Sequence, residues 1–114
     1  KPGDRGGNDV KVKWFRSESN LHRAWDSEMI DDTKLSYTEL AQSLGTPDKE
    51  TIKKWQSTGV RDCAMESVSY RPQVYDIGNS NLGYQYSYKY FSIAKTRMLQ
   101  AGVRLAGLLN QIYG

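Results

Sequence analysis

The sequence predicts a mainly α-helical, single-domain chain with a short β strand or hairpin near its N-terminus, and three observations support this. Apolar residues recur at steps of three or four through residues 84–113, which is the spacing of one side of a long helix. Valine and tryptophan alternate with lysine in residues 10–14, which is the period of a half-buried strand. The length of 114 residues fits one domain, and the share of hydrophobic residues, 38%, is ordinary for a globular protein.

The N-terminal region is predicted to pass from loop to strand to helix. Residues 1–8 contain three glycines and a proline, which favours a loop. The strand at 10–14 is short, so at most it supplies one arm of a hairpin. Residues 17–19 are interpreted as polar caps before a helix at 20–30, in which Asn20 is the N-cap.

The next predicted helix covers residues 37–44. Ser36 and Glu39 have the capping-box spacing, and Gly45 follows the last apolar position as a C-terminal stop signal. The apolar stripe of this helix consists of Tyr37, Leu40, Ala41 and Leu44.

Two further helices and a loop are predicted before the C-terminal segment. Residues 46–47, Thr-Pro, are interpreted as the N-cap and first position of a helix that stops near Gly59. Residues 60–71 are predicted to be helical, and Pro72 should kink or end them. The composition of residues 76–83 predicts a loop.

The most regular pattern lies at the C-terminal end, where a helix is predicted from about Tyr84 to Tyr113. Gly102 and Gly107 weaken it by about 1 kcal/mol each relative to alanine, although their small size would let another helix approach closely. The apolar stripe of this helix consists of Phe91, Ala94, Met98, Ala101, Leu105, Leu108 and Ile112.

Charge and cysteine content narrow the possible functions only slightly. The formal net charge of +3 permits binding to a polyanion without requiring it. Lys11, Lys13 and Arg16 are interpreted as a solvated strand face.

The single cysteine, Cys63, excludes an internal disulfide and a cysteine-rich zinc site. No stretch is long and apolar enough to span a bilayer, and no signal peptide is recognised.

His22, the only histidine, is followed four residues later by Asp26. On a helix this spacing places both side chains on one face, about 6 Å apart at Cβ, together with Met29. Imidazole and carboxylate are zinc ligands, but zinc takes about four. The spacing alone favours an exposed ion pair over a metal site, and any metal here needs further donors from outside the chain.

Three motifs together resemble the S1/P1 nucleases, which are zinc-dependent single-strand nucleases and 3'-nucleotidases related in fold to bacterial phospholipase C. Residues 4–8 read DRGGN, and residues 20–26 read NLHRAWD with Ile30 at a matching apolar position. The chain ends in AGVRLAGLLNQIYG, which is similar to the closing helix of the family. The resemblance spans residues 4–114, and it implies a phospholipase C/P1 nuclease-like helical fold that is incomplete here.

The resemblance implies that His22 and Asp26 bind one of three clustered zinc ions. The other ligands of that cluster in the family, an N-terminal tryptophan and further histidines and aspartates, are absent from this sequence. We therefore expect the chain to be the C-terminal part of such an enzyme, a processed or truncated product with at most a partial metal site. On the same resemblance, Trp14 and Trp25 are expected to pack in the core beneath the metal.

The segment DRGGN, residues 4–8, is called the glycine loop below. It is similar to the family loop that borders the pocket for the base upstream of the scissile bond. The resemblance makes Arg5, Gly6, Gly7 and Asn8 candidate substrate-binding residues. Arg5 replaces a position that is sometimes apolar, so it would meet phosphate or stack on the base. The alternative is that the glycines serve only a tight turn.

The implied activity is hydrolysis of phosphodiesters in single-stranded DNA or RNA and of 3'-nucleotides, leaving 5'-phosphates, by a secreted or periplasmic enzyme. The partners would be single-stranded nucleic acid and the missing N-terminal part. We expect this chain alone to bind zinc weakly and to be inactive.

Three alternatives stay open. The chain could be a non-catalytic helical module that binds a partner through an apolar surface. It could be a basic nucleic-acid-binding domain that uses Lys11, Lys13, Arg16 and Arg23. A phospholipase C-like substrate is a third possibility, against which the G-G-N loop argues.

Overall fold

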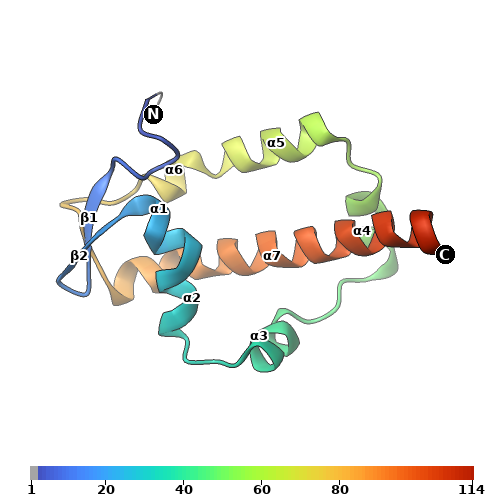
Figure 1. The fold of residues 1–114 in the computed structure, drawn as a ribbon, viewed down its shortest axis with the longest axis horizontal. Coiled ribbons are helices and arrows are strands. Elements are labelled where there is room, and N and C mark those ends of the chain that lie inside the picture. Colours follow the sequence, from blue (N-terminus) through green and yellow to red (C-terminus); the bar gives the residue numbers. More distant parts are fainter. Residues whose placement is uncertain (1–2) are drawn as a thin grey trace.

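A computed structural model describes residues 3–114 and is mainly α-helical, as the sequence predicts (Figure 1). Helix α7 (Tyr84–Tyr113) has 30 residues, so it is about 45 Å long and accounts for the 47 Å longest dimension of the molecule. Its bounds confirm the prediction for the C-terminal segment. None of the helices in residues 3–114 combines the length and apolar character that a bilayer crossing requires.

A small sheet lies at one end of the molecule, around the N-terminal end of α7 (Figure 1). Strand β1 (Lys11–Trp14) pairs antiparallel with β2 (Ser17–Asn20) and parallel with β3 (Asn81–Leu82), in the order β2-β1-β3. Phe15 and Arg16 join β1 to β2 with φ angles of 49° and 72°, the double positive φ of a tight hairpin turn.

Two predictions about this region were wrong. Residues 17–19 do not cap a helix, because they form β2. Residues 76–83 are not entirely loop, because β3 lies within them. In both cases the backbone bonds go to β1, a partner that the local composition does not show.

The hydrophobic core forms where the sheet, the first helical segment and the start of α7 meet. Leu21 and Met29 are its largest fully buried side chains, and each contributes about 1.5–3 kcal/mol by leaving water. The other buried members are Val12, Trp14, Ala24, Leu82 and Tyr86.

One continuous helical segment follows β2, but its middle turn is wider than an α-helix. It consists of α1 (Leu21–Arg23), the π-helix η1 (Ala24–Glu28) and α2 (Met29–Asp32). The amide of Met29 donates to the carbonyl of Ala24, five residues back. The side chain of Asn20 accepts from the amide of Arg23, which confirms it as the N-cap.

The π turn overturns one prediction about the helix faces. Met29 was expected beside His22 and Asp26, yet it is fully buried while those two are exposed. A π turn adds one residue before the next position on a given face. Met29 therefore follows Leu21 and Ala24 on the buried side.

Helix α3 (Tyr37–Leu44) confirms the predicted bounds and the capping box. Ser36 Oγ accepts from the Glu39 amide at 3.1 Å, and the Glu39 carboxylate accepts from the Ser36 amide at 2.9 Å. Gly45, with φ 74°, follows the helix end.

Helix α4 (Lys49–Gln56) begins later than predicted. Residues 46–47 are not its N-cap and first position, because Asp48 is the N-cap. The Asp48 carboxylate accepts from the Thr51 amide at 2.7 Å, and that bond lowers the pKa of Asp48. A carboxylate at a helix N-terminus also meets the positive end of the helix dipole, so it displaces the weaker threonine cap.

The predicted helix at 60–71 is divided into α5 (Val60–Ser69) and α6 (Arg71–Val74). The division falls at Tyr70, and Pro72 lies in the first turn of α6, where its missing amide costs no helical bond.

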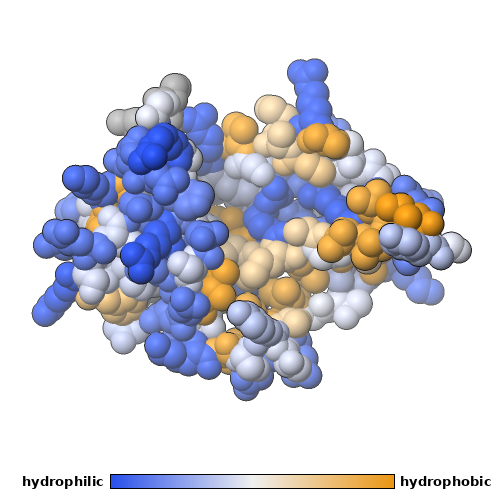
Figure 2. All heavy atoms as spheres, in the orientation of Figure 1, coloured by the Kyte–Doolittle hydropathy of each residue, from blue (hydrophilic) through white to orange (hydrophobic). Residues whose placement is uncertain are grey.

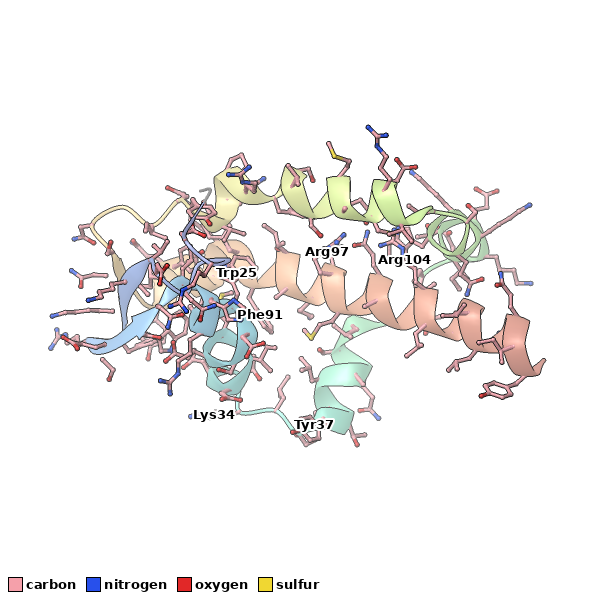
Figure 3. All side chains as sticks on the ribbon, turned by 45° about the horizontal axis from the view of Figure 1, so that its top comes forward. Trp25, Lys34, Tyr37, Phe91, Arg97 and Arg104 are labelled. Carbon is pink, nitrogen blue, oxygen red and sulfur yellow. The ribbon has the colours of Figure 1, made fainter. Side chains whose placement is uncertain are left out.

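Helix α5 is held against α7 by one carboxylate between two guanidinium groups. Glu66 accepts from Arg97 at 2.7 Å and from Arg104 at 2.8 Å on both carboxylate oxygens. Arg97 also donates to Ser67, and Arg104 donates to the Trp55 carbonyl at the end of α4. Figure 3 shows both arginines reaching from α7 into the space beside α5, so this cluster joins three helices.

Replacing Glu66 with glutamine is expected to lower the free energy of unfolding by about 1–3 kcal/mol, because a charged acceptor of several bonds is lost. The bonds from Arg104 and then Arg97 lower the pKa of Glu66 from 4.5 to about 2. The stabilisation is therefore complete above pH 4.5 and is lost as the pH falls through about 2. Urea unfolding of the wild type and of Glu66→Gln at pH 6 and pH 2.5 measures the difference in the free energy of unfolding, which should be smaller at pH 2.5.

Glu50, an exposed carboxylate on α4, provides the control for Glu66. Glu50→Gln should change stability by only a few tenths of a kcal/mol. Equal losses in the two variants at pH 6 would contradict a structural role for the Glu66 cluster.

Candidate metal centre

His22 and Asp26 lie on the same exposed side of the first helical segment and line one pocket of about 280 Å³. His22 comes from α1, and Asp26 comes from the π-helical turn that follows. The pocket is completed by the glycine loop and by the residues around the end of α6. Its remaining lining residues are Gly6, Gly7, Leu21, Trp25, Val74 and Tyr75.

The imidazole of His22 is held in one orientation by the glycine loop. Its Nδ1 lies 3.0 Å from the carbonyl oxygen of Gly6. A carbonyl only accepts, so Nδ1 carries the proton and donates. In the neutral ring the lone pair is then on Nε2, which is the tautomer in which histidines bind metals while their other nitrogen is anchored.

Gly7 brings the loop closer to the helix than a side chain would allow. Its φ is 90°, and a Cβ at this position would lie 3.0 Å from the backbone nitrogen of His22. The Gly7 carbonyl accepts from the His22 amide at 3.2 Å. Glycine is therefore required both for its backbone conformation and for the contact.

Asp4 holds the same loop in place through two hydrogen bonds. Its buried carboxylate accepts from the Tyr75 hydroxyl at 2.6 Å and from the Gly7 amide at 3.1 Å. These bonds, that of Tyr75 above all, hold the pKa of Asp4 well below its ordinary range. The carboxylate therefore stays charged and keeps the loop in place.

Trp25 and Tyr86 connect the site to α7. The indole Nε1 of Trp25 donates to the Tyr86 hydroxyl at 2.8 Å, and that hydroxyl donates to the Val74 carbonyl at 2.6 Å. Burial raises the pKa of Tyr86 to about 12, so it keeps its proton. Trp14 is buried, whereas Trp25 is half-buried, packs against the core and lines the pocket.

The loop residues named from the sequence divide between different surroundings. Gly6 and Gly7 line the pocket of His22. The Arg5 guanidinium bonds to Asp9 at 2.7 Å and does not line this pocket. Asn8 donates to the Arg5 carbonyl at 2.9 Å and lines a second hollow, beside the small sheet, instead.

Sequence reasoning missed Asp4, Tyr75 and Tyr86 as supports of the site. Asp4 belongs to the DRGGN motif, so the motif marked its position. The motif did not indicate that its carboxylate supports the loop. Tyr75 lies 71 residues from Asp4, and Tyr86 lies 61 residues from Trp25. No local sequence pattern links residues so far apart.

The residues present fit one part of a zinc site. A histidine with a free Nε2 and a carboxylate one turn away are suitable donors for zinc. In the part of the chain that the structure describes, no group of three or more histidine, cysteine, aspartate or glutamate residues is placed to hold a metal. Further donors would have to come from other residues than these.

Comparisons with known proteins agree on one family. The S1/P1 Nuclease family model matches residues 1–114. Endonuclease 4 of Arabidopsis thaliana is 30% identical over 97% of this chain and 43% of its own length. Endonuclease 3 of the same plant is 29% identical over 97% of this chain and 44% of its own length. The chain thus spans less than half the length of these relatives.

Proposed function

Because this chain belongs to the S1/P1 nuclease family, we propose that it is the C-terminal part of a zinc-dependent endonuclease. The substrates we propose are single-stranded DNA, single-stranded RNA and 3'-nucleotides, which would be cut to leave 5'-phosphates. The observation that carries the proposal is the shared pocket of His22 and Asp26, with the His22 tautomer set by Gly6.

In this proposal the chain's own residues hold a metal and transfer no proton. His22 would bind zinc through Nε2, and Asp26 through a carboxylate oxygen. A bound zinc ion supplies a hydroxide at neutral pH and stabilises negative charge on phosphate oxygens. The Gly6 carbonyl orients the imidazole, and Asp4 fixes the loop that carries Gly6.

Gly6 also leaves room beside the metal position. We propose that the loop admits an unstacked base there, because Gly6 lines the pocket without a side chain. Single strands are favoured by such a site, since their bases are free to leave the stack. Arg5 would have to release Asp9 before it could meet a phosphate.

The exposed apolar end of α7 supports the view that a further part of the enzyme packs here. Figure 2 shows hydrophobic side chains gathered over the C-terminal end of α7. Four large side chains in the last three turns are 43–60% exposed: Leu105, Leu108, Leu109 and Ile112. A self-sufficient helical module would cover such a face, so we propose that the N-terminal part of the enzyme does so.

The test of this function is a cleavage assay on single-stranded DNA with added zinc. We expect the 114-residue chain alone to be inactive because the ligand set is incomplete. Cleavage should appear when the N-terminal portion of a related enzyme is supplied, and it should be lost with His22→Ala. Strong zinc-dependent cleavage by the isolated chain would contradict the partial-site proposal, and so would activity that survives His22→Ala.

Leu108→Glu tests the proposed packing of α7 in the same assay. The substitution should leave the chain folded, because residue 108 is exposed and far from the core, but it should prevent activity in the combined sample. Circular dichroism checks the fold. The control is Tyr37→Glu, which changes an exposed apolar residue on α3 and should leave the activity unchanged. Undiminished activity with Leu108→Glu would contradict this packing.

For localisation, the family resemblance favours a secreted or periplasmic enzyme, and we propose the same for this one.

A further inference from the structure

A second hollow, larger than the pocket of His22, lies on the solvent face of the small sheet. It measures about 570 Å³ and contains parts of all three strands, the glycine loop and α1. We call it the basic groove and define it by six of its lining residues: Lys11, Lys13, Glu18, Asn20, Arg23 and Asn81. Figure 2 shows hydrophilic side chains covering this end of the molecule.

The strand alternation places the charges on this face. Val12 and Trp14 point into the core, so Lys11 and Lys13 point to solvent from the same strand. Lys11 is paired in register with Asn20 of β2. Lys13 is paired with Glu18 on one side and with Asn81 of β3 on the other.

The groove has an excess of positive charge. Lys11, Lys13 and Arg23 contribute three cations against the single carboxylate of Glu18. Within residues 3–114 neither lysine forms an ion pair. Arg23 lies 4.0 Å from Glu28 and is 65% exposed, so this contact does little to hold it. The lysine ammonium groups are therefore free to meet an anion.

The groove adjoins the metal pocket along two pairs of consecutive residues. Asn8 lines the groove, and Gly7 lines the metal pocket. Arg23 lines the groove, and His22 lines the pocket. A ligand that lies across the start of α1 would therefore contact both hollows.

We propose that the basic groove binds the sugar-phosphate backbone of a single-stranded nucleic acid next to the bond that is cut, an inference that rests on the proposed function. Lys11 and Lys13 are about 6.8 Å apart along the strand, which suits neighbouring phosphates of an extended chain. The lining contains no aromatic side chain, so the groove offers no stacking platform for bases. Contacts of this kind hold a strand regardless of its sequence.

The test is binding of a fluorescent oligothymidylate to the 114-residue chain without zinc, followed by anisotropy over a range of salt concentrations. Lys11→Gln with Lys13→Gln should weaken binding at least about 10-fold at low salt and reduce the slope of log K against log salt by about 1.4. The control is Lys53→Gln with Lys54→Gln, which removes the same charge from an exposed part of α4 and should have little effect.

The outcomes separate this inference from the metal site. The Lys11/Lys13 variant should bind zinc as tightly as the wild type, so that failure of the groove and failure of the metal site can be told apart. Equal weakening in the two double-lysine variants would overturn the inference, since only net charge would then matter. Equally tight binding of a polyglutamate peptide, lost with the same two lysines, would also overturn it, because the groove would then bind anions in general.

Discussion

Replacing His22 with alanine is expected to weaken zinc binding by about 100-fold or more. The free energy of zinc binding at structural sites with four ligands is roughly 10–16 kcal/mol. One ligand therefore contributes about 3 kcal/mol, which corresponds to about 100-fold in affinity. Asp26→Asn should have an effect of similar size, because the amide loses the negative charge that favours zinc. Isothermal titration with zinc at neutral pH measures both.

Asp31→Asn is the matched control for these substitutions. Asp31 is an exposed aspartate one helical turn beyond the site and lines none of the pockets described above. It should leave zinc affinity unchanged. If all three variants bind zinc as tightly as the wild type, the metal is held elsewhere and the proposed centre is wrong.

Gly7→Ala is expected to have the second largest effect, on stability and on zinc binding together. A methyl group at this position would be forced to 3.0 Å from the His22 backbone nitrogen, at a φ of 90°. The loop would have to move, and the Gly6 carbonyl would move away from Nδ1 of His22. We expect a loss of about 1–3 kcal/mol in stability and about 10–100-fold in zinc affinity.

Gly3 separates the two causes of the Gly7 effect. Its φ is 86°, close to that of Gly7, yet a Cβ there would meet nothing within 4 Å. Gly3→Ala therefore imposes a similar backbone strain without the collision. It should cost stability but leave zinc affinity unchanged. Equal loss of zinc affinity in both variants would contradict the role given to the Gly7 contact.

The helices that are recognisable from the sequence are those whose signals are local. The apolar spacing of α7 and the Ser36–Glu39 capping box depend on residues a few positions apart, and both predictions are confirmed. The start of α4 was misplaced because two capping signals compete within three residues, and the carboxylate of Asp48 prevails over Thr46.

The features that the sequence did not reveal depend on distant partners or on an unusual turn. Strand β3 has two residues and exists only through its pairing with β1, some 68 positions away. Met29 lies in the core because the turn of η1 is wider than that of an α-helix. The prediction missed this because helical periodicity assumes the same number of residues in every turn. The bond between Tyr75 and Asp4 joins residues that no motif connects.

The candidate site was partly predictable. The motif around His22 predicts that His22 and Asp26 share a site, and the structure places both side chains in one pocket. Their role as metal ligands stays a proposal. Which nitrogen of His22 is free could not be predicted, because the Gly6 carbonyl that decides it lies 16 residues away along the chain. Arg5 is a candidate for a substrate contact from the sequence, but in the folded loop its guanidinium bonds to Asp9.

The most direct test of the account is nuclear magnetic resonance of the single imidazole during a zinc titration. The chain has one histidine, so the ring nitrogen signals belong to His22 without assignment. We predict that zinc shifts the Nε2 signal while Nδ1 keeps its proton, and that Asp26→Asn weakens the response. Coordination through Nδ1, or a response that Asp26→Asn does not alter, would show that these two residues do not bind a common ion as proposed.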